Sequence, residues 1–201
     1  PPNTRWSLEL DYLSQRGPLV GTDGKYRGFD GDGRPFFGEG LGMYIHDDGT
    51  DNLGFDRRSL DPSDPNRGRL MHRHRHWLTD ELTLQTEIGY VSDRNLLEQY
   101  YEQEFDMGKD QETGALLRWA RENTALSLFA RGDINRFEND TQWLPRGDAY
   151  VLNEPLLDGN LYWSTHTSAA YATLEPAAAP TNPKPRTFIT SRPLPLSPPS
   201  C

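Results

Sequence analysis

The chain has 201 residues, with 21 Lys and Arg against 30 Asp and Glu, which gives a formal net charge of −9. This length suits one domain with a sizeable core. The acidic balance excludes a broad basic surface, so we expect no nucleic-acid partner. Hydrophobic residues make up only 34% of the chain, yet an aromatic content of 11% excludes a disordered protein. The single cysteine, Cys201, excludes an internal disulfide and a cysteine metal cluster.

The chain lacks the usual helical membrane and targeting segments. No stretch of 18 or more apolar residues occurs, so no transmembrane helix is predicted. Residues 1–6 lack the basic start and apolar run of a signal peptide, and they lack an initiator methionine. We therefore expect a section of a longer protein or a trimmed mature chain.

Alternation of apolar and polar residues is the main structural signal. It is clearest in 6–12 and 82–90, where every second residue is apolar. Such two-faced segments are typical of antiparallel sheets. The predicted strands are 5–15, 20–28, 37–47, 67–78, 81–92, 109–121, 124–136, 141–152 and 159–174. They form one unit over 1–175, whereas the eight prolines of 176–200 predict a disordered tail over 176–201.

Strand length and the connections favour a membrane barrel. Several predicted strands exceed the five or six residues usual in soluble sheets. Tight turns at Thr79-Asp80 and Glu122-Asn123 alternate with the long stretches 48–66 and 93–108, and residues 96–101 suit a short helical turn. This pattern indicates an all-β antiparallel up-and-down meander, a section of an outer-membrane β-barrel with about nine strands. Aromatic residues near strand ends suit interfacial girdles: Trp6, Tyr12, Trp77, Tyr90, Trp119 and Trp163.

Several short motifs occur in the order found in one family. Tyr90-Val91-Ser92-Asp93-Arg94 follows an alternating strand, and Trp143-Leu144-Pro145 opens a later one. A glycine-containing segment at 11–17, followed by Gly21 and Tyr26-Arg27, comes before these two motifs in the chain. Together they resemble the barrel of the LptD family, the outer-membrane proteins of lipopolysaccharide (LPS) assembly. The residues that carry this resemblance are Tyr90, Ser92, Asp93, Arg94, Trp143, Leu144 and Pro145.

The resemblance implies an outer-membrane protein that receives LPS from periplasmic bridge proteins and delivers it to the cell surface. It further implies contact with outer-membrane lipid, a lipoprotein plug similar to LptE, and a lateral opening between the first and last strands. It implies no cofactor and no enzymatic activity. Family barrels have many more strands than this chain and a periplasmic jelly-roll domain before them, so the chain resembles an interior section of such a barrel.

Polar residues on the predicted strands suggest a wet lumen and one alternative metal site. Glu9, Asp11, Gln85 and Glu87 would form a polar lumen lining. In the segment 72–76, His72, His74 and His76 share one face, with Arg73, Arg75 and Trp77 on the other. Histidines at alternate positions of a strand are able to bind zinc. However, same-face neighbours lie about 7 Å apart, so a mixed-charge strand is the favoured interpretation.

Two other functions remain open. Soluble β-sandwiches alternate for the same reason as barrels, so a sandwich that binds sugar or protein is the first alternative. A metal-dependent β-fold enzyme that uses the three histidines is the second. The aspartate-rich segments 30–33 and 47–51 lack the frame of a calcium loop and are better explained as turns. No serine nucleophile elbow or phosphate-binding glycine loop occurs.

Overall fold

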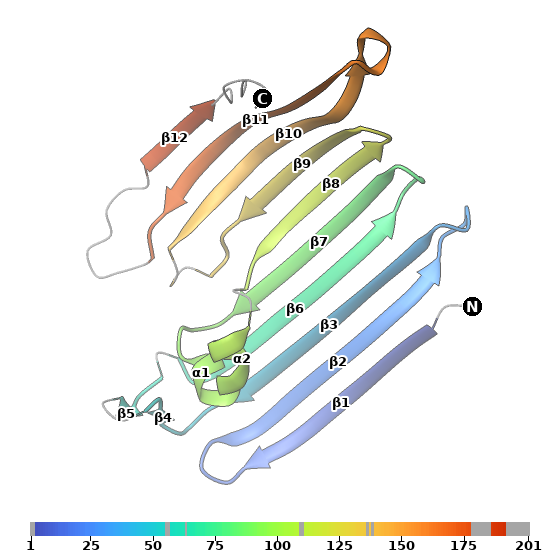
Figure 1. The fold of residues 1–201 in the computed structure, drawn as a ribbon. Helices are drawn as coiled ribbons and strands as arrows, with labels where there is room; N and C mark the ends of the chain where they lie inside the picture. The colour runs from blue at the N-terminus through green and yellow to red at the C-terminus, as the bar shows by residue number, and fades with distance from the viewer. Residues whose placement is uncertain are drawn as a thin grey trace.

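A computed structural model describes residues 3–54, 57–62, 64–108, 111–135, 137, 139–177 and 186–191. Its main element is a ten-stranded sheet in the order β1-β2-β3-β6-β7-β8-β9-β10-β11-β12 (Figure 1). All neighbouring strands are antiparallel, so the sheet is an up-and-down meander, as the sequence predicts. The bounds are β1 Asn3–Leu13, β2 Gly17–Phe29, β3 Pro35–His46, β6 Asn66–Trp77, β7 Leu82–Val91, β8 Thr113–Arg121, β9 Thr124–Gly132, β10 Asp140–Leu156, β11 Leu161–Glu175 and β12 Arg186–Ser191.

Each of the nine predicted strands has a counterpart, and the largest differences lie around β8. This strand begins at Thr113 instead of residue 109, and β9 ends at Gly132 instead of residue 136. The buried side chain of Asn135 explains part of the difference. Its amide group accepts a hydrogen bond from the backbone N–H of Val91 and donates one to the carbonyl of Gly89. A side chain thus replaces a neighbouring strand at the end of β7.

Strand β10 is longer than predicted because irregularities extend it. Its register shifts between Trp143 and Arg146 and again between Val151 and Glu154. Asn153, inside the second shift, has a φ of 52°, in the left-handed region that an asparagine tolerates better than most residues. The pairing with β11 therefore continues to Leu156 and a short 3₁₀ turn, η1 Leu157–Gly159.

One strand falls inside the segment predicted to be disordered. Within 176–201, the structure describes residues 176–177 and 186–191, and the latter pair with β11 as β12. Residues 186–191 contain no proline, so their backbone N–H groups are available to a neighbouring strand. The expectation of disorder therefore fails for these six residues, and the remainder of 178–201 lies outside the described residues.

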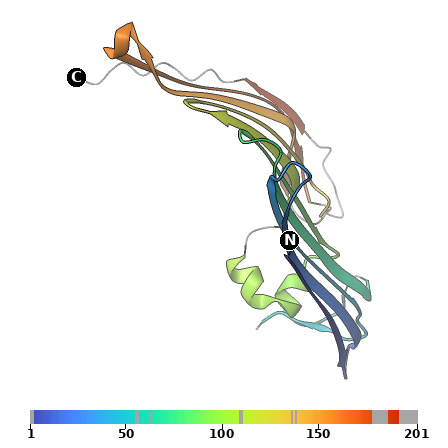
Figure 2. The same ribbon diagram turned by 90° about the vertical axis from the view of Figure 1, so that its right-hand side faces the viewer.

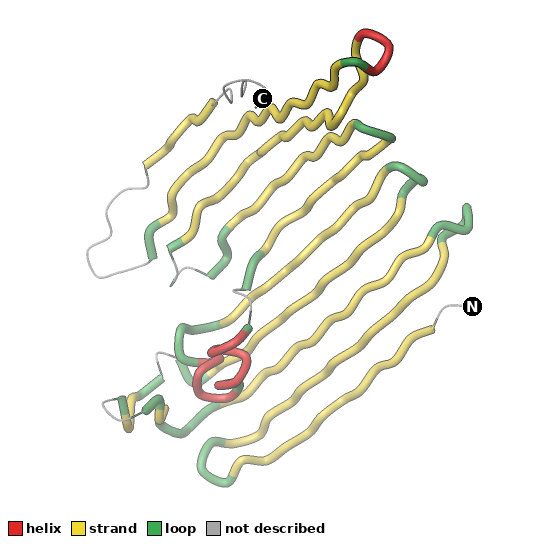
Figure 3. The backbone as a smooth tube through the Cα atoms, in the orientation of Figure 1, coloured by secondary structure: helices red, strands yellow, loops and turns green. Residues whose placement is uncertain are grey.

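The connections differ between the two ends of the sheet. At one end, β2–β3, β6–β7, β8–β9 and β10–β11 are joined by short turns (Figure 3). The other end, here called the loop end, carries the long connections 47–65 and 92–112. They contain the small strands β4 (Asp51–Asn52) and β5 (Arg58–Leu60) and the helices α1 (Leu96–Tyr100) and α2 (Glu102–Met107). The predicted helical turn at 96–101 is thereby confirmed.

The sheet is curved, and both helices lie on its inner side. Figure 2 shows the sheet edge-on as an arc, with α1 and α2 against the concave face at the loop end. Of the seven buried apolar side chains among the described residues, five lie in α1 or on the concave face of β3, β6 and β7: Leu96, Met43, Ile45, Met71 and Val91. This small core holds the helices on the sheet. The sheet itself is open, since β1 and β12 are its two edges among the described strands.

Candidate functional site

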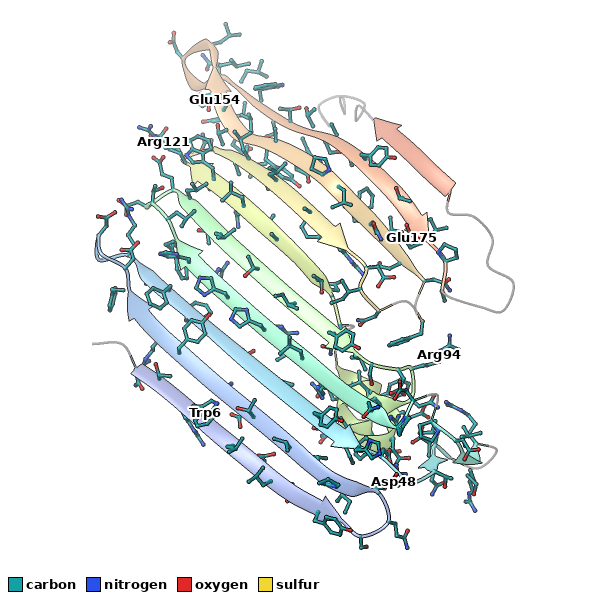
Figure 4. All side chains as sticks on the ribbon, turned by 180° about the vertical axis from the view of Figure 1, so that it is seen from behind. Trp6, Asp48, Arg94, Arg121, Glu154 and Glu175 are labelled. Atoms are coloured by element: carbon teal, nitrogen blue, oxygen red, sulfur yellow. The ribbon has the colours of Figure 1, made fainter. Side chains whose placement is uncertain are left out.

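The pairing register assigns every strand residue to the concave or the convex face. In β1, β2, β3, β6, β7 and β9, no Asp, Glu, Lys or Arg occupies a convex position. The charged residues of these strands all share the concave face with Arg67 and Arg69, which contact the helices. The convex face instead carries large, exposed apolar side chains, including Trp6, Leu8, Leu10, Tyr12, Val20, Leu70, Ile88, Leu126 and Leu128 (Figure 4).

All four residues of the predicted polar lining lie on the concave face. Glu9 pairs with Gly21 on the neighbouring strand, and Asp11 lies two residues further along β1. Gln85 and Glu87 pair with Arg75 and Arg73. The register therefore brings these residues to one face. That this face lines a lumen remains a prediction.

A groove of about 740 Å³ crosses the middle of the concave face, from β1 to β9. Six of the side chains around it are basic and three are acidic: Arg5, Lys25, Arg27, Arg73, Arg75 and Arg131 against Glu39, Glu87 and Glu112. The groove is therefore positive in charge although the whole chain is acidic.

Ion pairs connect part of this groove into a row across the strands. Lys25 Nζ lies 3.0 Å from Glu39 Oε2, and Arg73 Nη2 lies 3.1 Å from Glu87 Oε1. Arg131 closes the far side, with guanidinium nitrogens 2.6 Å from Glu112 Oε1 and from Asp140 Oδ1. Because these pairs are partly exposed to water, each adds little to stability, about 0–1 kcal/mol. Their effect is to fix the charge pattern of the groove.

A second polar cluster is buried at the loop end and centres on Arg67, whose side chain is fully buried. Its guanidinium donates hydrogen bonds of 2.9 Å to Asp47 Oδ2, 2.6 Å to Asp51 Oδ1 and 2.8 Å to Asp93 Oδ1. These three aspartates come from the two long connections. Arg67 on β6 therefore ties both connections to the sheet.

Arg16 and Tyr100 complete this loop-end cluster. Arg16 Nη1 donates to Asp47 Oδ2 over 2.8 Å, and the Tyr100 hydroxyl donates to the same oxygen over 2.6 Å. Burial works against the charge on Asp47, but hydrogen bonds from Tyr100, the Gly49 N–H and Arg67 nevertheless lower the pKa of this carboxyl group. Burial and the hydrogen bond to Asp47 raise the pKa of Tyr100 to about 12.

A further ion pair fastens α2 to the concave face. Arg69 Nη1 and Nη2 donate to the two carboxylate oxygens of Glu104, over 2.9 and 2.6 Å. The guanidinium carbon of Arg69 also lies 4.3 Å from the ring centroid of Tyr101. The loop-end cluster and this ion pair therefore hold the long connections and the helices on the sheet, which is a structural role.

The three histidines of β6 lie on the convex face, in an aromatic array. The Tyr26 hydroxyl is within hydrogen-bond distance of His72 Nε2 at 3.1 Å and His74 Nδ1 at 2.8 Å. His76 Nε2 lies 3.2 Å from Asp30 Oδ2 in the β2–β3 turn. Within the described part of the chain, no group of three or more His, Cys, Asp or Glu residues has the arrangement of a metal site. The metal alternative gains no support from this geometry.

The motif residues behind the family resemblance occupy two separate places. Ser92, Asp93 and Arg94 lie in the connection after β7. There, Asp93 binds Arg67, and Arg94 Nη2 donates to the carbonyl of Phe137 over 3.0 Å. Tyr90 precedes them on the convex face of β7. Trp143, Leu144 and Pro145 lie at the first register shift of β10, where the Leu144–Pro145 peptide bond is cis.

Two placements differ from, or were missed by, the sequence-based expectations. Trp77 was expected among the interfacial aromatic residues, but it lies on the concave face, 5.2 Å from the guanidinium carbon of Arg75. Sequence reasoning also missed the loop-end cluster. A signal was available, because Arg67, Arg69, Arg73 and Arg75 all occupy odd positions of one strand and so must share a face.

The described residues contain no helix long and apolar enough to span a membrane. Comparisons with models of protein families, with curated proteins and with solved structures found no match to this chain.

Proposed function

We propose that the sheet is a section of the wall of an outer-membrane β-barrel that takes part in LPS transport and assembly at the cell surface. The observation that carries the proposal is the separation of charge between the faces. Five consecutive strands, β1, β2, β3, β6 and β7, place no Asp, Glu, Lys or Arg on the convex side, and neither does β9. Strand β8, between β7 and β9, has one such residue, Arg121 at its end. A lipid-facing surface requires this absence of charge, since an Arg or Lys at the bilayer midplane costs about 2–4 kcal/mol.

Strand length and curvature support the same proposal. A tilted strand needs about 9–11 residues to cross the hydrocarbon core. The shortest strands between β1 and β11 in the large sheet, β8 and β9, have 9 residues each, and β1 has 11. The helices and the charged side chains lie on the inner side of the arc. In a barrel, that side faces an aqueous lumen, where charges remain hydrated.

The histidines on the convex face each have one ring nitrogen within hydrogen-bond distance of a protein partner, which reduces the cost of placing them against lipid. Tyr26 serves His72 and His74, while Asp30 serves His76. A hydrogen bond to one nitrogen of an imidazole offsets part of the cost of burying that polar group. By contrast, Arg73 and Arg75 line the concave groove.

The role in LPS transport rests on the amphipathic chemistry of that lipid and on the family resemblance. A charged concave face suits the sugar and phosphate portion, while the apolar convex face and the open edges of the sheet suit acyl chains. A soluble sandwich would need a second layer over the apolar convex face. Among the described residues, the additional elements are the concave helices, the β4–β5 hairpin and the short 3₁₀ turn η1 between β10 and β11.

The membrane part of the proposal is tested by placing one arginine on each face of β9. Leu128, 51% exposed, is convex, and its neighbour Ser127 is concave opposite Asp148. Each variant is refolded with phosphatidylcholine vesicles and separated by flotation. Leu128→Arg should reduce the inserted fraction by the equivalent of about 2–4 kcal/mol, and Ser127→Arg should leave it nearly unchanged. Equal effects of the two variants on the inserted fraction would contradict the proposal.

The transport part is tested by cross-linking in cells that make LPS. A photoreactive phenylalanine replaces Gln85 on the concave face or Thr86 on the convex face of the same strand. We expect the Gln85 variant to cross-link to the sugar portion of LPS, and the Thr86 variant to cross-link to acyl chains. If neither position captures LPS from a membrane-inserted protein, the LPS assignment fails while the barrel assignment stands.

A further inference from the structure

The concave groove contains three arginines that have no carboxylate partner among the described residues. Lys25, Arg73 and Arg131 have carboxylate partners. Arg5, Arg27 and Arg75 have no ion pair with any part of the chain that the structure describes, although all three line the groove. For Arg75, the Nε atom is buried and has no hydrogen-bond partner within the described ranges. A buried guanidinium nitrogen without a partner loses hydration without compensation, so its position favours an external acceptor.

The register places these three cations close together. Arg27 pairs with Phe37, and Phe37 pairs in turn with Arg75, so the two arginines are two strands apart in one row. With about 4.8 Å between strands, their backbones are roughly 10 Å apart. Arg5 pairs with Lys25, which is the neighbour of Arg27 on the concave face of β2, two residues earlier in the chain. One ligand is therefore able to contact Arg27 and Arg75 together, with Arg5 at the rim.

We propose that this part of the groove is a binding site for a ligand that carries two or more phosphate groups. Two arginines whose backbones are roughly 10 Å apart on one face suit two anionic groups on one molecule. Guanidinium binds phosphate through paired N–H donors, which gives charge-assisted hydrogen bonds. Phe37, 47% exposed, lies between the two arginines and offers an apolar contact to the part of the ligand that joins the phosphates.

The inference deepens the proposed function, because it names the chemistry that the concave face would bind, but the geometry does not require a bilayer. The full chain, refolded in nonionic detergent, is titrated with inositol hexakisphosphate by calorimetry. Arg27→Gln and Arg75→Gln should each weaken binding about tenfold, equivalent to one charge-assisted contact. The matched control is Arg118→Gln, which removes a concave arginine of β8 that does not line the groove. It should change binding less than twofold.

Salt and a local fluorophore provide independent readouts. The wild-type affinity should fall steeply with salt, and the slope should be smaller in the Arg27 and Arg75 variants. Trp77 lies beside Arg75, so ligand binding should change its emission. Absence of binding at low salt, or an equal loss in Arg118→Gln, would overturn the site. Far-ultraviolet circular dichroism of each variant separates lost binding from lost folding.

The source of the phosphate is resolved by a second titration. Detergent micelles doped with a lipid phosphate monoester compete with inositol hexakisphosphate if the groove accepts phosphate at a lipid surface. Competition by the micelles supports a lipid-borne ligand, and binding of the free compound alone supports a soluble one. Equal effects of Leu128→Arg and Ser127→Arg in the flotation experiment would remove the barrel proposal and leave this site intact. Failure of both titrations would remove the site and leave the barrel.

Discussion

Replacement of Arg67 by methionine tests whether the loop-end cluster holds the long connections on the sheet. Arg67→Met keeps most of the side-chain volume and removes the cation between Asp47, Asp51 and Asp93. Asp47 retains Arg16 at 2.8 Å, but Asp51, which is fully buried, retains Arg16 only at 3.6 Å. Removal of one partner from a buried ion pair costs about 3–5 kcal/mol, because a charge stays buried without compensation.

We expect Arg67→Met to lower the free energy of unfolding by about 3 kcal/mol, the smaller value of that range, because Arg16 remains. Urea unfolding of the refolded chain, followed by tryptophan fluorescence, measures the change. The control Arg118→Met removes an exposed arginine on β8 and should cost less than about 0.5 kcal/mol.

A second substitution separates charge from packing. Asp51→Asn in the Arg67→Met background removes one of the stranded charges, so it should restore part of the lost stability. Limited proteolysis should show faster cleavage within 47–65 and 92–112 in Arg67→Met than in the double variant. A loss below about 1 kcal/mol for Arg67→Met, or no recovery in the double variant, would refute the electrostatic explanation.

Three further predictions concern packing and pH. An alanine at Gly38 would place its Cβ 2.7 Å from the carbonyl oxygen of Arg73 and against the Tyr26 ring, so Gly38→Ala should lower the free energy of unfolding in urea by about 1–3 kcal/mol. The control Gly31→Ala, whose Cβ meets no atom within 4 Å, should be nearly neutral. Equal effects of the two variants would argue against the close contact at Gly38. The phenol of Tyr100 should ionise at about 12, above its ordinary value of 10.0, as measured by the ultraviolet absorbance difference between wild type and Tyr100→Phe. Because the folded pKa is raised, the contribution of Tyr100 to stability is present below pH 10 and is lost between pH 10 and about 12; a difference spectrum that titrates at 10 would contradict its burial. The pKa of Asp47 is lowered in the folded state, so its stabilising contribution should persist at neutral pH and disappear as the pH falls below about 4. In Asp47→Asn, the free energy of unfolding should therefore depend less on pH in the acid range. An unchanged pH dependence would show that the ion pairs of Asp47 contribute nothing.

The existence and order of the strands could be predicted from the sequence because alternation is a local property. In 6–12 and 82–90, apolar and polar side chains alternate so clearly that all the apolar residues must lie on one face of the sheet and the polar residues on the other. The short turns at 79–80 and 122–123 and the helical turn at 96–101 also depend on neighbouring residues alone. These predictions are confirmed by β1, β7 and α1 and by the turns between β6 and β7 and between β8 and β9.

Strand β6 shows where the sequence by itself was insufficient. His72, His74 and His76 alternate with Arg73 and Arg75, so both faces are polar and the segment does not reveal which face is which. Pairing with β3 and β7 decides it, because Glu39 and Glu87 lie beside Arg73. Likewise, β12 could not be predicted because proline-rich flanks dominate the local composition, whereas its pairing partner β11 is supplied by the sheet.

The sequence by itself determined the all-β class, the meander and the two-sided character of the strands, because these follow from the period of the side chains. Only the tertiary structure decided the curvature, the placement of the helices on the concave face and the convergence of Arg67 with aspartates from two distant connections. It also decided which arginines of the groove have partners. These features depend on contacts between residues far apart in the chain, and the local alternation of a strand carries no information about its cross-strand neighbours.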